Sequence, residues 1–214
     1  MSHVFYPLKK IIELNGCNIS TDRIKILCDV ETLYFYDCIV DLCEGAFLSR
    51  FIPMPLNIFS SLSQIQIKYC KNIKKLFSSN WVLHNLQNLS LLYVLGCEEM
   101  EEIIASELEE EEGISSASFK FTLPNLLKFY LCDLPELKSI CGANGVLVCD
   151  SIQCIEIRNC PKLKRLPLNL PSQDDGQPYP PSLTTIYIYP KEWWELVEWD
   201  HPNAKPLLEP YVKK

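Results

Sequence analysis

The chain has 214 residues, of which 48% are hydrophobic and 22% charged, a balance typical of one globular domain rather than a disordered segment. Its formal net charge of -7 argues against nucleic acid as a partner, because an acidic surface repels phosphate. No apolar run approaches the ~18 residues that a membrane span needs, and residues 1–17 lack the apolar core of a signal peptide. Without such a signal, the 11 cysteines predict reduced thiols in a cytoplasmic protein with no membrane partner.

One pattern of apolar residues recurs along the chain. Three apolar residues, separated first by two positions and then by one, are followed three positions later by a residue that is usually Cys. We call this last position the Cys slot. The six copies are Val30, Leu33, Phe35 and Cys38; Leu62, Ile65, Ile67 and Cys70; Leu89, Leu92, Val94 and Cys97; Leu126, Phe129, Leu131 and Leu134; Ile152, Ile155, Ile157 and Cys160; and Leu183, Ile186, Ile188 and Lys191. A degenerate earlier copy is Ile12, Leu14 and Cys17.

The spacing within each copy predicts a strand with one buried face. Side chains two residues apart in a strand point to the same side, so the second and third apolar residues of each copy face one core. The residue in the Cys slot turns inward as the strand ends. One copy cannot bury its own core, so the copies must stack. The sequence therefore predicts an α/β fold, a leucine-rich-repeat solenoid (horseshoe) with a parallel concave β-sheet and irregular or short-helical convex segments.

The repeats divide the chain into three predicted parts: 1–23, a degenerate N-terminal repeat; 24–190, about six irregular leucine-rich repeats; and 191–214, a C-terminal cap and tail. Residues 98–118 are expected to form an acidic loop, because 98–112 contains nine Glu and no basic residue. Within it we expect a short convex helix from Met100 to Leu108, followed by a disordered segment, the whole lying outside the core. Three tryptophans are expected to cover the open end of the core rather than bind a ligand: Trp193, Trp194 and Trp199.

Residues between the inward positions must point outward, onto the concave sheet. Down the stack the first outward row is Tyr34, Gln66, Tyr93, Tyr130, Glu156 and Tyr187. The second row is Tyr36, Lys68, Leu95, Cys132, Arg158 and Tyr189. With Tyr69 included, seven of the ten tyrosines are expected at exposed strand positions. Tyr suits a half-buried pleated surface, and its rings can stack across strands. Alternatively, the two rows except Leu95 and Cys132 form a protein-binding surface, because Tyr offers a large contact area at low entropic cost.

The motifs of enzymes and of metal sites are absent from the sequence. There is no Cys-x-x-Cys pair, and the three histidines are His3, His84 and His201. None of the seven glycines lies in a G-x-x-x-x-G-K-[ST] phosphate loop. We therefore expect no catalytic residue, no metal and no cofactor.

Four segments resemble the repeats of plant nucleotide-binding leucine-rich-repeat disease resistance proteins of the coiled-coil class: LQNLSLLYVLGCEEMEEIIA, LPNLLKFYLCDLPELKSIC, IQCIEIRNCPKLKRLPL and PPSLTTIYIYPKEWWELVEWDHPNAK. The resemblance covers roughly residues 24–208. It implies a protein-recognition module of an intracellular immune receptor, with a pathogen effector or a host guarded protein as its partner. It also implies contact with a nucleotide-binding switch module in a full-length receptor. Because the phosphate loop is absent, we expect a fragment, a truncated gene product or a repeat-only relative.

Other binding functions remain as alternatives. The main one is the substrate-binding repeat region of a ubiquitin-ligase adaptor, which should carry an F-box helix bundle and more regular repeats. An extracellular receptor ectodomain should show a signal peptide and paired capping cysteines. Neither set of features is visible in the sequence, so recognition of a protein in the cytoplasm is the favoured function.

Overall fold

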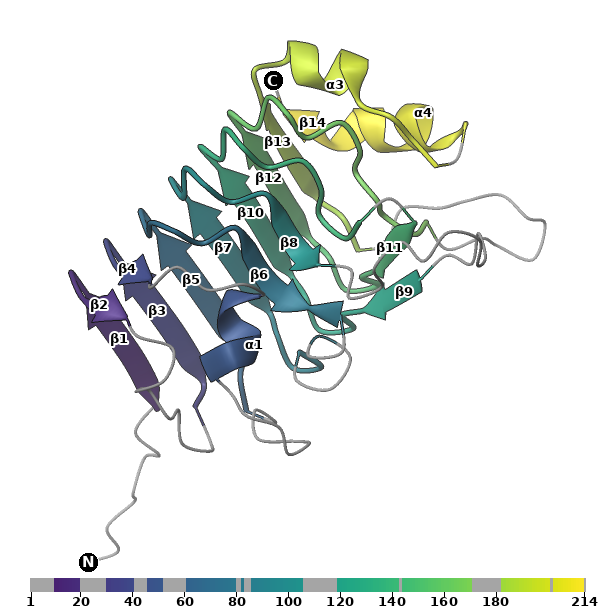
Figure 1. Ribbon diagram of the computed structural model, residues 1–214. Helices are drawn as coiled ribbons and strands as arrows, with labels where there is room; N and C mark the ends of the chain where they lie inside the picture. Colours follow the sequence, from purple (N-terminus) through teal and green to yellow (C-terminus); the bar gives the residue numbers. More distant parts are fainter. Residues whose placement is uncertain are drawn as a thin grey trace, which may run out of the picture.

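The computed structural model describes residues 10–19, 30–40, 46–51, 61–79, 82, 86–105, 119–142, 144–170, 182–200 and 202–213. An eight-stranded parallel sheet runs along one side of the molecule, and short strands with helix α1 (Phe47–Phe51) lie on the other side (Figure 1). In spatial order its strands are β1 (Ile11–Asn15), β3 (Thr32–Tyr36), β5 (Gln64–Lys68), β7 (Leu91–Leu95), β10 (Lys128–Cys132), β12 (Cys154–Arg158), β13 (Thr185–Tyr189) and β14 (Val212–Lys213).

The register of the sheet follows the sequence repeat. The second apolar residue of each copy pairs with that of the next, and all six are buried: Leu33, Ile65, Leu92, Phe129, Ile155 and Ile186. The third apolar residues pair in the same way and are also buried: Phe35, Ile67, Val94, Leu131, Ile157 and Ile188. Each such side chain contributes about 1.5–3 kcal/mol of burial free energy. The predicted leucine-rich-repeat solenoid is therefore confirmed.

The side of the core opposite the large sheet is built mainly from short parallel strand pairs. These are β2 (Asn18–Ile19) with β4 (Ile39–Val40), β6 (Lys75–Ser78) with β8 (Glu102–Ala105), and β9 (Phe119–Thr122) with β11 (Gly145–Val148). The helix expected from Met100 to Leu108 is wrong, because Glu102–Ala105 is strand β8. Pairing with β6 from the preceding repeat and burial of the β-branched Ile103 and Ile104 outweigh the helical propensity of the glutamates.

Part of the acidic stretch belongs to the core, contrary to expectation. Met100 and Ile103 are almost fully buried, at 0% and 1% exposure. The glutamates before and between them stay at the surface, where Glu101 pairs with Lys138 at 2.6 Å. The remainder of the predicted loop, residues 106–118, lies outside the described residues.

A left-handed backbone conformation ends each of the first six long strands. The residues concerned have φ between 49° and 64°: Gly16, Asp37, Tyr69, Gly96, Asp133 and Asn159. Tyr69 was expected on a strand, and this is wrong, because the residue forms the turn after β5. A Cβ atom added to Gly96 would lie 2.5 Å from the Tyr69 ring. Glycine at this turn therefore allows the ring of the preceding repeat to pack over the backbone.

The Cys slot points into the core, as predicted. The thiol of Cys38 donates to the Leu14 carbonyl at 3.4 Å, and the thiol of Cys160 donates to the Leu131 carbonyl at 3.5 Å. Both acceptors lie at the equivalent place in the preceding strand. The thiol of Cys70 donates within its own repeat, to Lys68 at 3.5 Å. The thiols of these buried cysteines thus find carbonyl acceptors near the ends of the strands, although a thiol is only a weak donor.

Raised thiol pKa values predict a pH-dependent stability. Burial raises the pKa of Cys97, Cys149 and Cys160 from 9.0 to about 12. Between these values the unfolded state has lost the proton that the folded state keeps. Stability is therefore full below about pH 9 and falls by up to about 1.4 kcal/mol per pH unit and thiol as the pH rises towards 12. We expect the melting temperature, followed by calorimetry, to decrease over this range.

Thiol labelling provides an independent measurement of the same property. At pH 8 an aromatic disulfide reagent should react slowly with these thiols in the native protein and rapidly after denaturation, because the thiolate is the reactive form. Equal native and denatured rates would contradict the burial of these three thiols.

The C-terminal end of the sheet is covered by α3 (Glu192–Leu196), α4 (Ala204–Leu208) and the 3₁₀ turn Glu209–Tyr211 (Figure 1). Trp193 and Trp194 are buried within the core cluster, and the indole of Trp194 packs edge-on against Trp199 with centroids 5.0 Å apart. The indole N–H of Trp193 donates to the Leu163 carbonyl at 2.6 Å. The tryptophans predicted to form a cap thus cover the last repeats.

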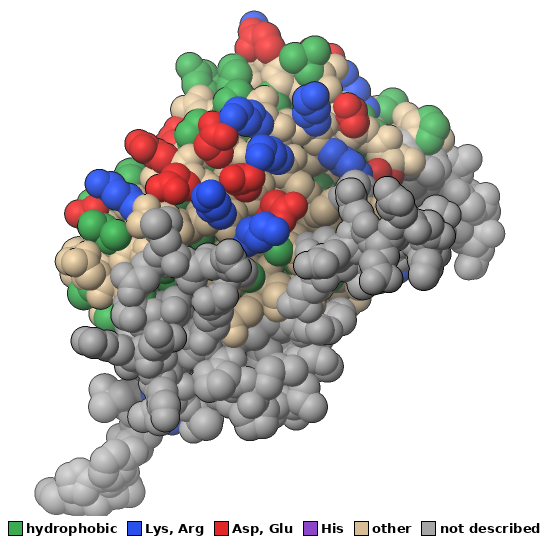
Figure 2. All heavy atoms as spheres, viewed as in Figure 1, with side chains coloured by type: hydrophobic (Ala, Val, Ile, Leu, Met, Phe, Trp, Pro, Cys, Tyr) green, Lys and Arg blue, Asp and Glu red, His purple; other side chains and the backbone are tan. Residues whose placement is uncertain are grey.

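Lys and Arg side chains are interspersed with Asp and Glu on the face shown in Figure 2. Ion pairs link successive repeats: Lys75–Glu102 at 3.5 Å, Lys138–Glu101 at 2.6 Å, Lys162–Glu136 at 2.5 Å and Arg165–Asp200 at 2.6 Å. Exposed pairs of this kind contribute at most about 1 kcal/mol each. Stacking of the repeats therefore depends chiefly on the buried apolar core.

Candidate protein-binding surface

The outward positions of the eight strands form one continuous face, which we call the outer sheet face. It corresponds to the predicted concave surface. The strand register places the first predicted row side by side: Tyr34, Gln66, Tyr93, Tyr130, Glu156 and Tyr187. The second row is equally in register: Tyr36, Lys68, Leu95, Cys132, Arg158 and Tyr189. Neighbouring members are about 4.8 Å apart along the hydrogen-bonding direction. Residues far apart in sequence therefore form a single surface.

The N-terminal half of this face is an aromatic cluster around one lysine. The rings of Tyr34 and Tyr36 lie 6.4 Å apart, and Tyr36 packs edge-on against Tyr69 at 5.5 Å. The Lys68 ammonium lies 5.2 Å from the Tyr34 ring centroid and 4.7 Å from that of Tyr93. Each such contact contributes about 0.5–1 kcal/mol at an exposed site. The two rings thus hold the ammonium between β3 and β7.

The centre of the face is an edge-on pair of rings, Tyr93 and Tyr130, with centroids 5.7 Å apart. Burial raises the pKa of Tyr93 above its ordinary value, and burial together with a hydrogen bond to Cys154 raises that of Tyr130 to about 12. Burial, and next the charge of Glu13, raises the pKa of Tyr34. These phenols are therefore neutral at physiological pH and can donate hydrogen bonds to a partner.

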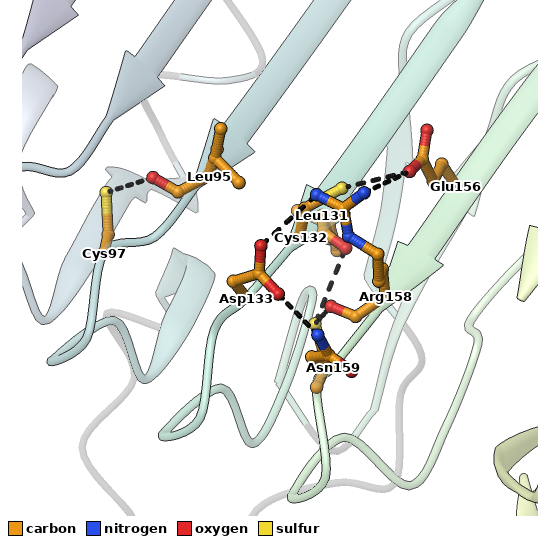
Figure 3. Close-up of polar contacts among 9 residues, drawn as sticks. Leu95, Cys97, Leu131, Cys132, Asp133, Glu156, Arg158 and Asn159 are labelled. Carbon is orange, nitrogen blue, oxygen red and sulfur yellow. Dashed lines mark hydrogen bonds and ion pairs between the residues drawn. The ribbon is translucent and has the colours of Figure 1, made fainter. Parts of the chain in front are cut away.

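A polar network at the ends of β10 and β12 fixes Arg158 (Figure 3). Its guanidinium lies 3.2 Å from Asp133 and 3.7 Å from Glu156. The Asn159 amide donates to the other oxygen of Asp133 at 2.6 Å. The Cys132 thiol is buried and donates to Glu156 at 3.5 Å, and burial raises its pKa to about 12. The charge of Arg158 is thus largely satisfied within the protein.

An open hollow of about 510 Å³ lies beside this network at the C-terminal end of the face. Its lining residues are Glu156, Ile157, Arg158, Tyr187, Ile188, Tyr189 and Lys213. Tyr187 and Tyr189 are 49% and 63% exposed, which makes them the most accessible aromatic side chains of the two rows. Lys213 was missed by the sequence reasoning, because the two-residue strand β14 carries no repeat signal.

Not every outward position is available to a partner. Leu95 is 8% exposed and Cys132 is 1% exposed, although both lie in the second row. The middle of that row is therefore covered by neighbouring side chains, and the accessible groups lie on either side of it. Within the described part of the chain, no three His, Cys, Asp or Glu side chains gather where they could hold a metal ion. The described helices include none long and apolar enough to cross a membrane.

The fold and its outer face define a class of protein, the leucine-rich-repeat proteins. Residues 46–169 match the family model described as plant disease resistance protein RPS2-like, leucine-rich repeats. This match covers more than half of the 214 residues, so the chain belongs to that family.

Individual relatives agree with the family match. The chain is 35% identical over 142 residues to the probable disease resistance protein At4g14610 of Arabidopsis thaliana. This alignment covers 66% of this chain and 18% of the relative. It is 32% identical over 142 residues to the disease resistance protein RPS5 of the same plant, covering 66% of this chain and 14% of RPS5. The disease resistance protein UNI, also from this plant, is 29% identical over 187 residues, 86% of this chain and 19% of UNI.

The chain spans less than a fifth of the length of At4g14610, RPS5 and UNI. No solved structure matches it.

Proposed function

We propose that this chain is the protein-recognition module of an intracellular plant immune receptor, which senses pathogen effectors or host proteins that effectors have modified. Family membership supports a role in the defence response. The observation that carries the choice of surface is the row of tyrosine rings on the outer sheet face. The partner is a protein in the cytoplasm, and the docking residues are the members of the two rows other than the covered Leu95 and Cys132.

The geometry of the tyrosines favours docking over a purely structural role. Tyr suits the pleated surface of a sheet, and this alone would explain its presence. However, about half or more of the surface of Tyr187 and Tyr189 is exposed. These side chains therefore bury less area within the protein than a purely structural residue would. The half-buried Tyr93 and Tyr130 are held at fixed positions by their ring contact. Rigid aromatic groups are typical of interface hot spots, because little entropy is lost on binding.

The double substitution Tyr93→Ala and Tyr130→Ala tests the proposal. The chain would first be screened by interferometry against purified pathogen effectors and host proteins, and a binding protein titrated against the variants. Hot-spot side chains contribute about 2 kcal/mol or more each, so we expect the affinity to fall at least ~30-fold. Loss of the ring–ring contact itself should cost about 0.5–1.5 kcal/mol of stability, in addition to the lost burial of two half-buried rings, so the melting temperature is measured alongside the affinity.

Phe119→Ala is the matched control, because this ring is 46% exposed on β9, outside the eight-stranded sheet. It should leave both affinity and melting temperature nearly unchanged. A partner that binds the double variant as tightly as the parent chain would place the docking surface elsewhere.

A further inference from the structure

The charge of the outer sheet face is opposite to that of the whole chain. The chain carries a formal net charge of -7. The outward positions of the eight described strands carry four cations and two carboxylates, a net charge of +2: Lys68, Lys128, Arg158 and Lys213 against Glu13 and Glu156. Asp133, in the turn after β10, pairs with Arg158 and reduces this to +1. An acidic group on a partner is therefore repelled by much of the molecule and attracted to this face.

Within the described part of the chain, the lysines of the face have no carboxylate partner, in contrast to Arg158. Among the described residues, no carboxylate lies within 4.0 Å of the ammonium groups of Lys68, Lys128 or Lys213. Arg158, by contrast, lies between Asp133 and Glu156. The lysines therefore retain their full charge for a ligand.

Lys68 is the best prepared of these groups. Its side chain is half-buried, and its ammonium lies over the rings of Tyr34 and Tyr93. The faces of these rings attract the cation but offer no lone pair for an N–H hydrogen bond. An ammonium has three N–H donors, and no described residue accepts a hydrogen bond from this one. A carboxylate that approaches the sheet there meets a positioned cation flanked by neutral phenols that can also donate. Such pre-organisation reduces the entropic cost of binding.

We propose that the outer sheet face binds an extended acidic segment of a partner protein, with Lys68 as the anchoring cation. This rests on the proposed function and specifies the chemistry of the partner. Five strand spacings separate β5 from β14, about 24 Å in all, and an extended segment of about seven residues spans that length. One segment can therefore reach from Lys68 to the hollow beside Lys213.

The experiment measures fluorescence anisotropy of a labelled ten-residue peptide of alternating Glu and Gly added to the whole chain. We expect saturable binding with a Kd below about 1 mM that weakens as salt is raised. Lys68→Met should weaken binding at least fivefold, and Lys68→Glu should transfer the preference to the corresponding Lys-Gly peptide. Lys120→Met is the matched control, because Lys120 is an exposed strand residue of β9, outside the sheet. It should leave the Kd unchanged.

Three results would overturn this inference: no saturable binding of the acidic peptide, equal binding by the parent chain and Lys68→Met, or tighter binding of a ten-residue thymidine oligonucleotide. If the acidic peptide fails while Tyr93→Ala with Tyr130→Ala still abolishes binding of a protein partner, the docking surface stands and its acidic preference is wrong. If the double substitution also has no effect, the proposed docking surface fails as well.

Discussion

Replacement of Cys70 by lysine is expected to remove a large part of the stability of the chain, whereas asparagine at the same position should leave most of it intact. Cys70 is 1% exposed, and burial raises the pKa of its thiol well above the ordinary value. A lysine there would place an unpaired charge in the core, which costs about 3–5 kcal/mol, against a total stability of about 5–15 kcal/mol. Asparagine can replace the thiol as donor to the Lys68 carbonyl, 3.5 Å away. Guanidinium unfolding followed by circular dichroism measures the difference.

The last repeat provides the control for this prediction. Lys191 occupies the Cys slot there, but it is exposed and directly precedes α3. Lys191→Cys should therefore change the unfolding midpoint little. If Cys70→Lys and Cys70→Asn unfold at the same denaturant concentration, the slot tolerates charge and its interpretation as a core position is wrong.

Truncation of Trp194 to alanine should destabilise the C-terminal end of the solenoid by about 3–5 kcal/mol. This indole is fully buried, packs on Trp199 and donates a hydrogen bond to the Glu209 carboxylate. Its removal would leave a cavity above the last repeats and take one hydrogen-bond donor away from the Glu209 carboxylate. Because 1 kcal/mol changes the melting temperature of a chain of this size by about 2–4 °C, we expect a decrease of about 6–20 °C by calorimetry.

Leu196→Ala is a matched substitution in the same helix, because Leu196 is 78% exposed. It should lower the melting temperature by no more than about 2 °C, since surface substitutions usually change stability by less than 0.5 kcal/mol. Equal losses from the two substitutions would mean that burial of Trp194 does not hold the C-terminal end together.

The long strands, their stacking and the two rows of the outer sheet face could all be predicted from the spacing of apolar residues. A strand repeats its side-chain direction every two residues, so the spacing of Ile65 and Ile67 fixes which side of β5 is buried. The same spacing recurs in each repeat, and the repeats therefore pair in a single register. The outward positions of Gln66 and Lys68 follow from this without any knowledge of the tertiary structure.

Tertiary structure alone decided the elements that depend on contacts between repeats. Glu102–Ala105 is a strand because β6 of the previous repeat pairs with it, and its glutamates gave a contrary local signal. Tyr69 lies in a turn because the next repeat presents Gly96 beneath its ring. Lys213 joins the hollow through β14, whose two residues pair with a strand more than twenty positions earlier. The spacing of apolar residues within one repeat carries no information about these contacts, because each contact depends on where the backbone of another repeat lies.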